Sequence, residues 1–227
     1  MTRIIDNLLI RWPTRLLFCG ALPLSACAAV STPSTQQAAA MPVSASTVPS
    51  PETTTQLRHH DLQVDVHFEV IGKERLQVHY SVDNQGAMPM LVFDRGNVHA
   101  ILTKQQSVGA VGQPLFRMQG RDLTLSHLAR ALPDPTPISP PTPVAARVPQ
   151  GERLQGRFTF DLTLADAPQR VRWCLGVAAF NDNDFQQARD GNGVDLWTAS
   201  FAMADTQQQL CTPWFDLQAG RFEDTAS

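Results

Sequence analysis

Leu62-Gln-Val-Asp-Val-His-Phe-Glu-Val70 and Leu76-Gln-Val-His-Tyr-Ser-Val82 decide the fold of this chain. In both stretches apolar residues alternate with polar ones. A period of two residues is typical of β-strands that bury one face and leave the other in water. Because only the glycine-containing segment 71–75 separates the two stretches, they are predicted to pair as an antiparallel hairpin.

The register of this hairpin brings two histidines together. If residue 70 faces residue 76, His67 lies opposite His79 on the outward face, with about 5 Å between the Cβ atoms. Two neutral imidazoles at that separation could bind zinc or copper, with Asp65 or Glu69 as a third ligand. The alternative is a pair of solvated histidines on a wet sheet face, and a register shift of one residue would remove the site.

Strand patterns continue along the chain as far as residue 217. Turn-forming residues separate the apolar segments at intervals of about ten residues. The predicted strands are 62–70, 76–82, 88–93, 98–103, 154–164, 171–177 and 208–217, with weaker candidates at 115–118 and 123–125. Residues 126–132 fit a short helical turn, 181–195 fit a polar loop, and 196–204 are apolar without a clear period. We therefore predict an all-β fold, an immunoglobulin-like β-sandwich of about seven to nine strands.

Two segments resemble known families. Residues 82–93 read Val-Asp-Asn-Gln-Gly-Ala-Met-Pro-Met-Leu-Val-Phe, and residues 148–154 read Val-Pro-Gln-Gly-Glu-Arg-Leu. Together they resemble the strand pair and the Pro-x-Gly-Glu turn of immunoglobulin-like modules in bacterial envelope proteins. They are also similar to intracellular proteinase inhibitors of the bacillus type, which implies protease inhibition as an alternative function. No inhibitory residue can be matched position by position.

A proline-rich segment interrupts the strand pattern. Residues 133–143 read Pro-Asp-Pro-Thr-Pro-Ile-Ser-Pro-Pro-Thr-Pro. Proline has no N–H to donate to a sheet, so the segment is predicted to be a surface loop or a sheet edge. A stiff crossing between two sheets is the favoured interpretation, and a docking site for a partner that binds proline-rich segments is the alternative.

The first residues have the layout of an export signal. Arg3, Arg11 and Arg15 precede a short apolar run at 16–24, and small residues follow it. A basic end, an apolar core and a small-residue cleavage site are typical of a secretory signal. The apolar run is too short to cross a bilayer as a helix.

Leu24-Ser25-Ala26-Cys27 resembles the lipobox of bacterial lipoproteins. The resemblance implies that residues 1–26 are a signal peptide and that Cys27 carries lipid, including palmitate. More than one acyl chain makes membrane attachment stable. Ala28 stands where an aspartate often retains such proteins in the inner membrane, which implies the outer membrane, facing the periplasm. The alternative is an ordinary cleaved signal with an incidental cysteine.

Composition divides the rest of the chain into a tether, a domain and a tail. Residues 27–56 are rich in alanine, serine, threonine, glutamine and proline and show no apolar period, so we predict a flexible tether that begins at the acylated cysteine. Residues 57–217 are the predicted β-sandwich domain. Residues 218–227 are predicted to be a flexible tail.

The four cysteines have separate predicted fates. Cys19 leaves with the signal peptide, and Cys27 carries lipid. Cys174 and Cys211 remain as a pair in an oxidising compartment, so we predict a disulfide that joins the last two strands or their sheets. The alternative is two separate buried thiols.

Charge and motifs exclude several functions. A formal net charge of -3 without basic blocks argues against a nucleic-acid partner. The serine-hydrolase, zinc-protease and phosphate-loop motifs are missing from the sequence, so we expect a non-enzymatic protein without a cofactor. The loop 181–195 holds four aspartates and could bind calcium, but Gln187 occupies the glycine position of an EF-hand, and turn chemistry is the simpler interpretation.

The sequence therefore predicts a lipid-anchored protein of the bacterial cell envelope. Taken whole, the chain resembles uncharacterised proteobacterial envelope lipoproteins that carry an immunoglobulin-like domain. Its β-sandwich is expected to bind another envelope component, a protein, without catalysis. The alternatives are a periplasmic metal-binding protein that uses His67 and His79, a protease inhibitor with an exposed rigid loop, and a hydrolase whose site is assembled from distant loops.

Overall fold

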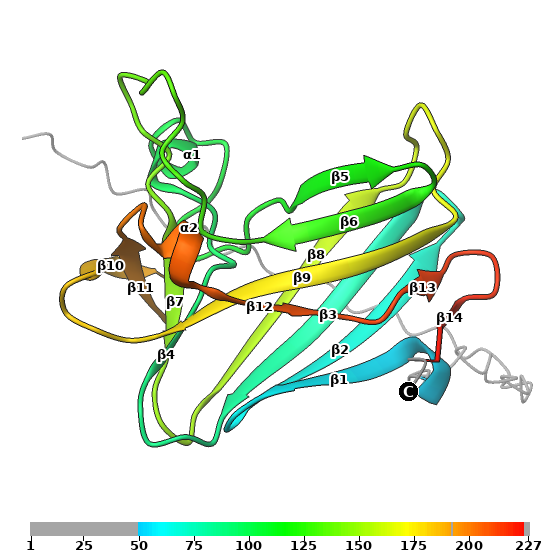
Figure 1. The fold of residues 1–227 in the computed structure, drawn as a ribbon, viewed down its shortest axis with the longest axis horizontal. Helices are drawn as coiled ribbons and strands as arrows, with labels where there is room; N and C mark the ends of the chain where they lie inside the picture. Colours follow the sequence, from blue (N-terminus) through cyan, green and yellow to red (C-terminus); the bar gives the residue numbers. More distant parts are fainter. Residues whose placement is uncertain (1–49, 192, 225–227) are drawn as a thin grey trace, which may run out of the picture. The chain divides into compact units, whose positions relative to one another are not determined.

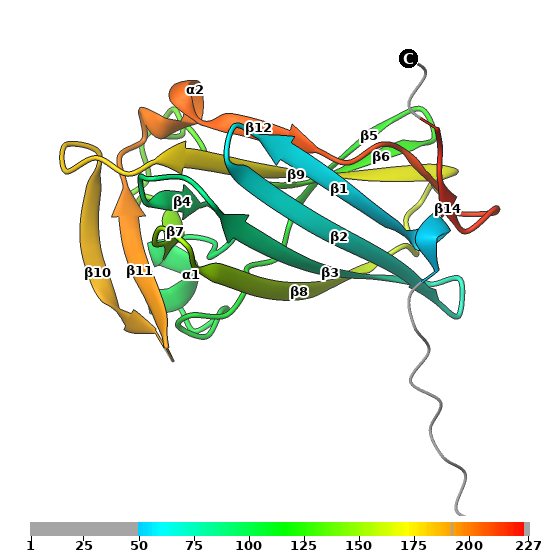
Figure 2. The ribbon, with the colours of Figure 1, turned by 90° about the horizontal axis from the view of Figure 1, so that it is seen from below.

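The predicted hairpin forms the centre of a four-stranded antiparallel sheet. The computed structural model describes residues 50–191 and 193–224 of the chain. The strands of the first sheet are β1 (Thr54–His59), β2 (Leu62–Ile71), β3 (Arg75–Asn84) and β8 (Arg153–Asp161). They lie in the order β1-β2-β3-β8, and Figure 2 shows them side by side. Buried and more exposed residues alternate along β2 and β3, as the sequence predicts.

The second sheet contains the other strands. They are β4 (Met90–Val92), β5 (Leu115–Gln119), β6 (Asp122–His127), β7 (Val144–Val148), β9 (Arg170–Ala179), β10 (Phe185–Gly191), β11 (Val194–Ala199), β12 (Gln208–Cys211), β13 (Phe215–Asp216) and β14 (Arg221–Phe222). The main order is β10-β11-β7-β4-β9-β13-β14, with β12 also beside β9 and β5 beside β6. β6 pairs with β9 in parallel, whereas β4, β12 and β13 pair with β9 antiparallel.

The two sheets pack face to face around one main apolar core (Figures 1 and 2). Its largest fully buried members are Phe68, Leu76, Leu123, Leu125, Trp173, Leu175 and Phe215. These side chains come from alternate positions of strands in both sheets, so each strand contributes one apolar face. The structure confirms the predicted all-β sandwich. It has more strands than predicted, because several strands are only two to five residues long.

The sandwich extends beyond both predicted limits. A 3-10 turn, η1 (Pro51–Thr53), and the start of β1 lie inside the predicted tether 27–56. β14 lies inside the segment predicted to be a flexible tail. The prediction was wrong at this point, because the partly buried Phe222 packs against the core. Its ring centroid lies 4.9 Å from that of Phe68 and 5.1 Å from that of Phe215. A lone phenylalanine shows no period, so only tertiary packing defines this strand.

The prediction of a strand at 98–103 was wrong, because residues Val98–Leu102 form the short helix α1. The side chain of Asn97 accepts a hydrogen bond from the backbone N–H of Ala100 at 2.9 Å and caps the first turn. The apolar residues Val98, Ile101 and Leu102 are spaced by three and four positions, which suits a helix better than a strand.

Three other segments differ from their predictions. The helical turn predicted at 126–132 is absent: residues 126 and 127 belong to β6, beside β9, and residues 128–132 are in neither a helix nor a strand. The predicted polar loop 181–195 is mostly strand, since β10 forms a hairpin with β11. The predicted closing strand 208–217 is two strands, and Pro213, which has no N–H to donate, lies in the gap between them. After β11 the chain forms the short helix α2 (Met203–Thr206).

The beginning and end of the described chain lie together. Arg221 Nη1 in β14 lies 3.9 Å from Glu52 Oε1 in η1. Figures 1 and 2 both place η1 and β14 at one end of the sandwich and α1 at the other end. The long strands of the two sheets span the region between these ends.

Candidate functional site

The outward face of the four-stranded sheet carries the predicted histidine pair. His67 lies opposite His79, as the sequence predicts, and the register adds Thr54 on β1 and Arg157 on β8. We call these four residues the histidine row. They line part of an open groove of about 1060 Å³. The next row across the sheet also lines this groove and consists of Gln56, Asp65, Ser81 and Gln155.

The two imidazoles differ in their surroundings. Burial lowers the pKa of His67 below its usual value, and the charge of His79 lowers it further, whereas Glu69 acts in the opposite direction. His67 is therefore neutral at pH 7, and one ring nitrogen can accept a hydrogen bond or a metal ion. The ring centroids of His67 and His79 are 6.1 Å apart.

The histidine row lacks a third metal ligand. Within residues 50–191 and 193–224, no three His, Cys, Asp or Glu side chains are grouped so as to hold an ion. The carboxylate of Asp65 accepts hydrogen bonds from the side-chain amides of Gln56 at 2.7 Å and Gln63 at 3.1 Å. Arg157 places a positive charge opposite His79, which disfavours a cation. Metal binding by the two histidines alone stays a prediction.

The acidic segment 181–195 is organised by its own hydrogen bonds. The side chain of Asn181 accepts from the backbone N–H groups of Asn183 at 3.1 Å and Asp184 at 3.0 Å. Asp184 in turn accepts from the hydroxyl of Ser200 at 3.0 Å. These bonds are turn chemistry, the simpler of the two interpretations of this segment.

A buried hydrogen bond connects the two sheets. Tyr80 lies on the inner face of β3, and its hydroxyl donates to Asp94 Oδ2 at 2.5 Å, two residues after β4. Asp94 is fully buried, and its Oδ1 lies 3.0 Å from Arg95 Nε, within ion-pair distance although the N–H is not aligned for a hydrogen bond. Burial raises the pKa of Tyr80 well above its usual value, and the neighbouring carboxylate raises it further. Gly156, opposite Tyr80 on β8, leaves the space that the phenol ring occupies.

We predict that Tyr80→Phe lowers the free energy of unfolding by about 1–3 kcal/mol, because it leaves a buried carboxylate oxygen without its donor. Urea unfolding of the two proteins measures this difference. In a double-mutant cycle, Asp94→Asn should cost less in the Tyr80→Phe background than in the wild type, since the two side chains share one interaction. Additive effects would contradict the assignment.

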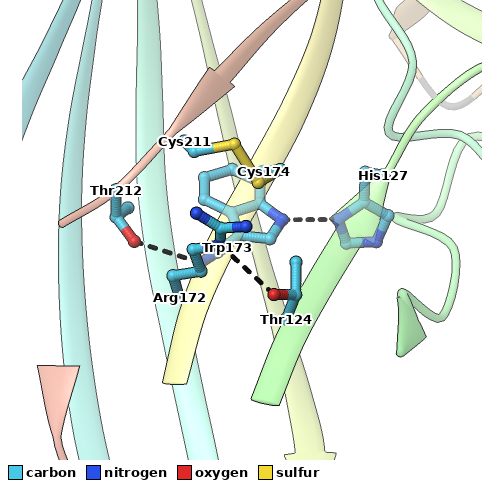
Figure 3. The surroundings of a disulfide bond; sticks show 7 residues. All are labelled: Thr124, His127, Arg172, Trp173, Cys174, Cys211 and Thr212. Carbon is cyan, nitrogen blue, oxygen red and sulfur yellow. Dashed lines mark hydrogen bonds between the residues drawn. A yellow bond between two sulfur atoms is a disulfide. The ribbon is translucent and has the colours of Figure 1, made fainter. Parts of the chain in front are cut away.

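A second buried group of hydrogen bonds surrounds Trp173. Figure 3 shows the partners of this residue. Its indole Nε1 donates to His127 Nδ1 at 2.9 Å, and its backbone N–H donates to the hydroxyl of Thr212 at 3.0 Å. His127 Nε2 therefore carries the proton of the neutral ring and donates to the carbonyl of Gly112 at 2.9 Å. The indole also lies 4.7 Å from the ring of Tyr80, centroid to centroid, so the two polar centres are in contact.

The sequence prediction missed this centre. The sequence predicts a helical turn at 126–132, which contains His127, and gives no role to Asp94. The available signal is that Leu123, Leu125 and His127 occupy every second position, which places the histidine on the buried face of a strand. A buried histidine must find partners for both ring nitrogens, and the indole of Trp173 is one donor that can provide this.

The protonation of His127 should make stability depend on pH. Burial lowers the pKa of His127 below 6.5, while its bond to Gly112 and the charge of Asp94 act in the opposite direction. Because the folded state favours the neutral ring, its stabilising contribution is complete above about pH 6.5 and is lost as the pH falls below this value. We predict that the free energy of unfolding decreases between pH 7 and pH 5 by up to about 1.4 kcal/mol per pH unit for this group.

Unfolding of His127→Gln at several pH values tests this prediction. The variant should have a flatter pH dependence between pH 7 and pH 5 than the wild type. His67→Gln is the matched control, because the pKa of His67 is lowered in the same direction but its ring is only partly buried. An equal slope for the wild type and His127→Gln would be inconsistent with a neutral, hydrogen-bonded His127.

The predicted disulfide joins Cys174 and Cys211, as Figure 3 shows. The two residues are direct partners on the neighbouring strands β9 and β12, with Cα atoms 4.0 Å apart. The bond therefore ties two strands of one sheet, the first of the two predicted arrangements. The bond links residues 37 positions apart in the sequence. The loss of chain entropy in the unfolded state stabilises the fold by about 4 kcal/mol for a loop of this length.

Comparisons with protein-family models, curated proteins and solved structures give no match to this chain. The geometry of the described residues therefore carries the functional argument. Among these residues, none of the helices is long and apolar enough to cross a membrane. Cys27, the predicted lipid attachment site, lies outside the described residues.

Proposed function

We propose that this protein is a lipid-anchored protein of the bacterial cell envelope whose β-sandwich binds another envelope protein without catalysing a reaction. The observation that carries this proposal is the pairing of Cys174 with Cys211 on adjacent strands. Disulfides persist in oxidising compartments such as the periplasm and are rare in the cytosol. The pairing therefore supports export of the chain, which is the role expected of the segment that precedes Cys27.

A tethered sandwich is suited to binding because its surface can be presented at a distance from the membrane. The segment 28–49 follows the lipid site and has the composition of a flexible linker. Ala28 supports attachment to the outer membrane, with the domain facing the periplasm. The exposed loops that connect the strands provide contact surfaces on a rigid scaffold.

The anchor is tested by Cys27→Ala in the full-length chain. The variant has no thiol to acylate, so it should move from the membrane fraction to the soluble periplasmic fraction or remain unprocessed. Cell fractionation and mass measurement of the mature protein provide the readout. Cys19→Ala is the matched control and should partition as the wild type does. Unchanged membrane partitioning of Cys27→Ala would contradict the lipid anchor.

Metal binding by the histidine row is a second candidate function, favoured by the direct pairing of His67 with His79. If these residues bind zinc or copper, the isolated protein should take up the ion, and His79→Ala should abolish uptake. His99→Ala is the control, since His99 lies on α1 and contacts Ser139 instead. Equal uptake by the wild type and His79→Ala would exclude this site.

A further inference from the structure

The segment between β6 and β7 contains the most exposed apolar side chain of the described residues. The side chain of Ile138 is fully exposed, and that of Leu132 is 40% exposed. We call residues 132–143 the proline loop. Side chains from 131 to 139 are all exposed, so this part of the loop contributes nothing to the apolar cores.

The backbone of the loop has free hydrogen-bonding groups. Within the described chain, no backbone N–H or carbonyl of residues 130–139 takes part in an intramolecular hydrogen bond. The first internal bond appears at the end of the loop, where Thr142 N–H donates to the carbonyl of Pro140 at 2.9 Å. The free carbonyls and the proline rings are the groups that proline-rich ligands present to aromatic-lined grooves.

The loop is stiff because of its sequence. A proline fixes its own φ angle and also restricts the residue that precedes it to extended conformations. Ile138 is the one residue in 132–143 that is neither a proline nor directly before a proline. Binding such a segment costs little conformational entropy, since most of its freedom is already lost in the free protein.

Two hydrogen bonds connect the loop to α1, one on Ser139 and one on Thr142. Ser139, next to Ile138, shares a hydrogen bond of 3.0 Å with His99 Nδ1. The carbonyl of Thr142 accepts from Val98 N–H at 2.9 Å. Leu102 is 66% exposed and lies three residues after His99, on the same face of α1. Two exposed apolar side chains, Ile138 and Leu102, thus flank one hydrogen bond.

We propose that the proline loop is the element through which this protein binds its envelope partner, and that the partner is a protein with an aromatic-lined groove for the exposed residues 133–139 and an apolar pocket for Ile138. This inference rests on the proposed function and identifies the surface that binds the partner. A lipid surface fits less well, because the loop contains Asp134 and no basic residue that would attract anionic headgroups.

A photo-crosslinking amino acid in the full-length, exported chain tests the proposal. In one variant the probe replaces Leu102, which lies beside the loop. In a second variant it replaces Arg157, which lies on the polar face of the four-stranded sheet. Loop variants carry Ile138→Asp, which should leave the fold intact because the side chain has no apolar neighbour to lose. Met88→Asp is the matched control, since Met88 is also an exposed apolar side chain (60%) but lies outside the loop. Thermal unfolding of both variants checks that they are folded.

The expected result is a protein adduct from position 102 that falls at least about tenfold with Ile138→Asp and is unchanged with Met88→Asp. A synthetic peptide of residues 131–144 should compete for this adduct, and the same peptide with Ile138→Asp should not. An adduct that is insensitive to Ile138→Asp, or an adduct with lipid alone, overturns the inference.

The two probe positions separate this inference from the proposed function. An adduct with a protein from position 157 alone overturns the proline loop as the docking element but keeps the role in binding an envelope protein. Absence of any protein adduct from both positions, in cells that export the chain, contradicts both.

Discussion

The buried carboxylate of Asp94 is the constraint on which much of this structure depends. A carboxylate in an apolar core is tolerated only when its oxygens have partners, and Tyr80 and Arg95 provide them. Arg95 also donates to the carbonyl of Gly109 at 2.8 Å, and the backbone carbonyl of Asp94 accepts from Gly112 N–H at the same distance. The loop 94–112, which contains α1, is thereby fixed to the core of the sandwich.

The second buried polar centre, around Trp173 and His127, extends this hydrogen-bond network through Gly112. Gly112, which binds the backbone of Asp94, also accepts from His127, and His127 accepts from the indole of Trp173. In the parallel pairing of β6 with β9, Leu125 lies opposite Trp173 and His127 lies two residues further along β6, so the imidazole is within hydrogen-bond reach of the indole. Polar groups from both sheets are thus joined within an otherwise apolar core, and such networks favour one specific arrangement of the packed layers.

The sequence predicts the regular parts of this fold well because alternation is a local signal. The hairpin, the pairing of His67 with His79 and the inward residues of β9 all follow from a period of two. Two short elements were missed for different reasons: α1 has a local signal, the cap at Asn97, whereas β14 depends on the tertiary packing of Phe222. The Tyr80–Asp94 contact joins residues on different sheets, and no spacing along the chain encodes it.

The position of β1 has a mechanical consequence. β1 begins at Thr54, close to where the described chain starts, and pairs with β2 over its whole length, from Thr54 opposite His67 to His59 opposite Leu62. The end that carries η1 lies opposite the end that carries α1 (Figures 1 and 2). A pull on the chain that precedes η1, against a load at α1, would act along β1 rather than across it. The interstrand hydrogen bonds would then share the force in shear, a geometry that resists extension better than opening them one after another.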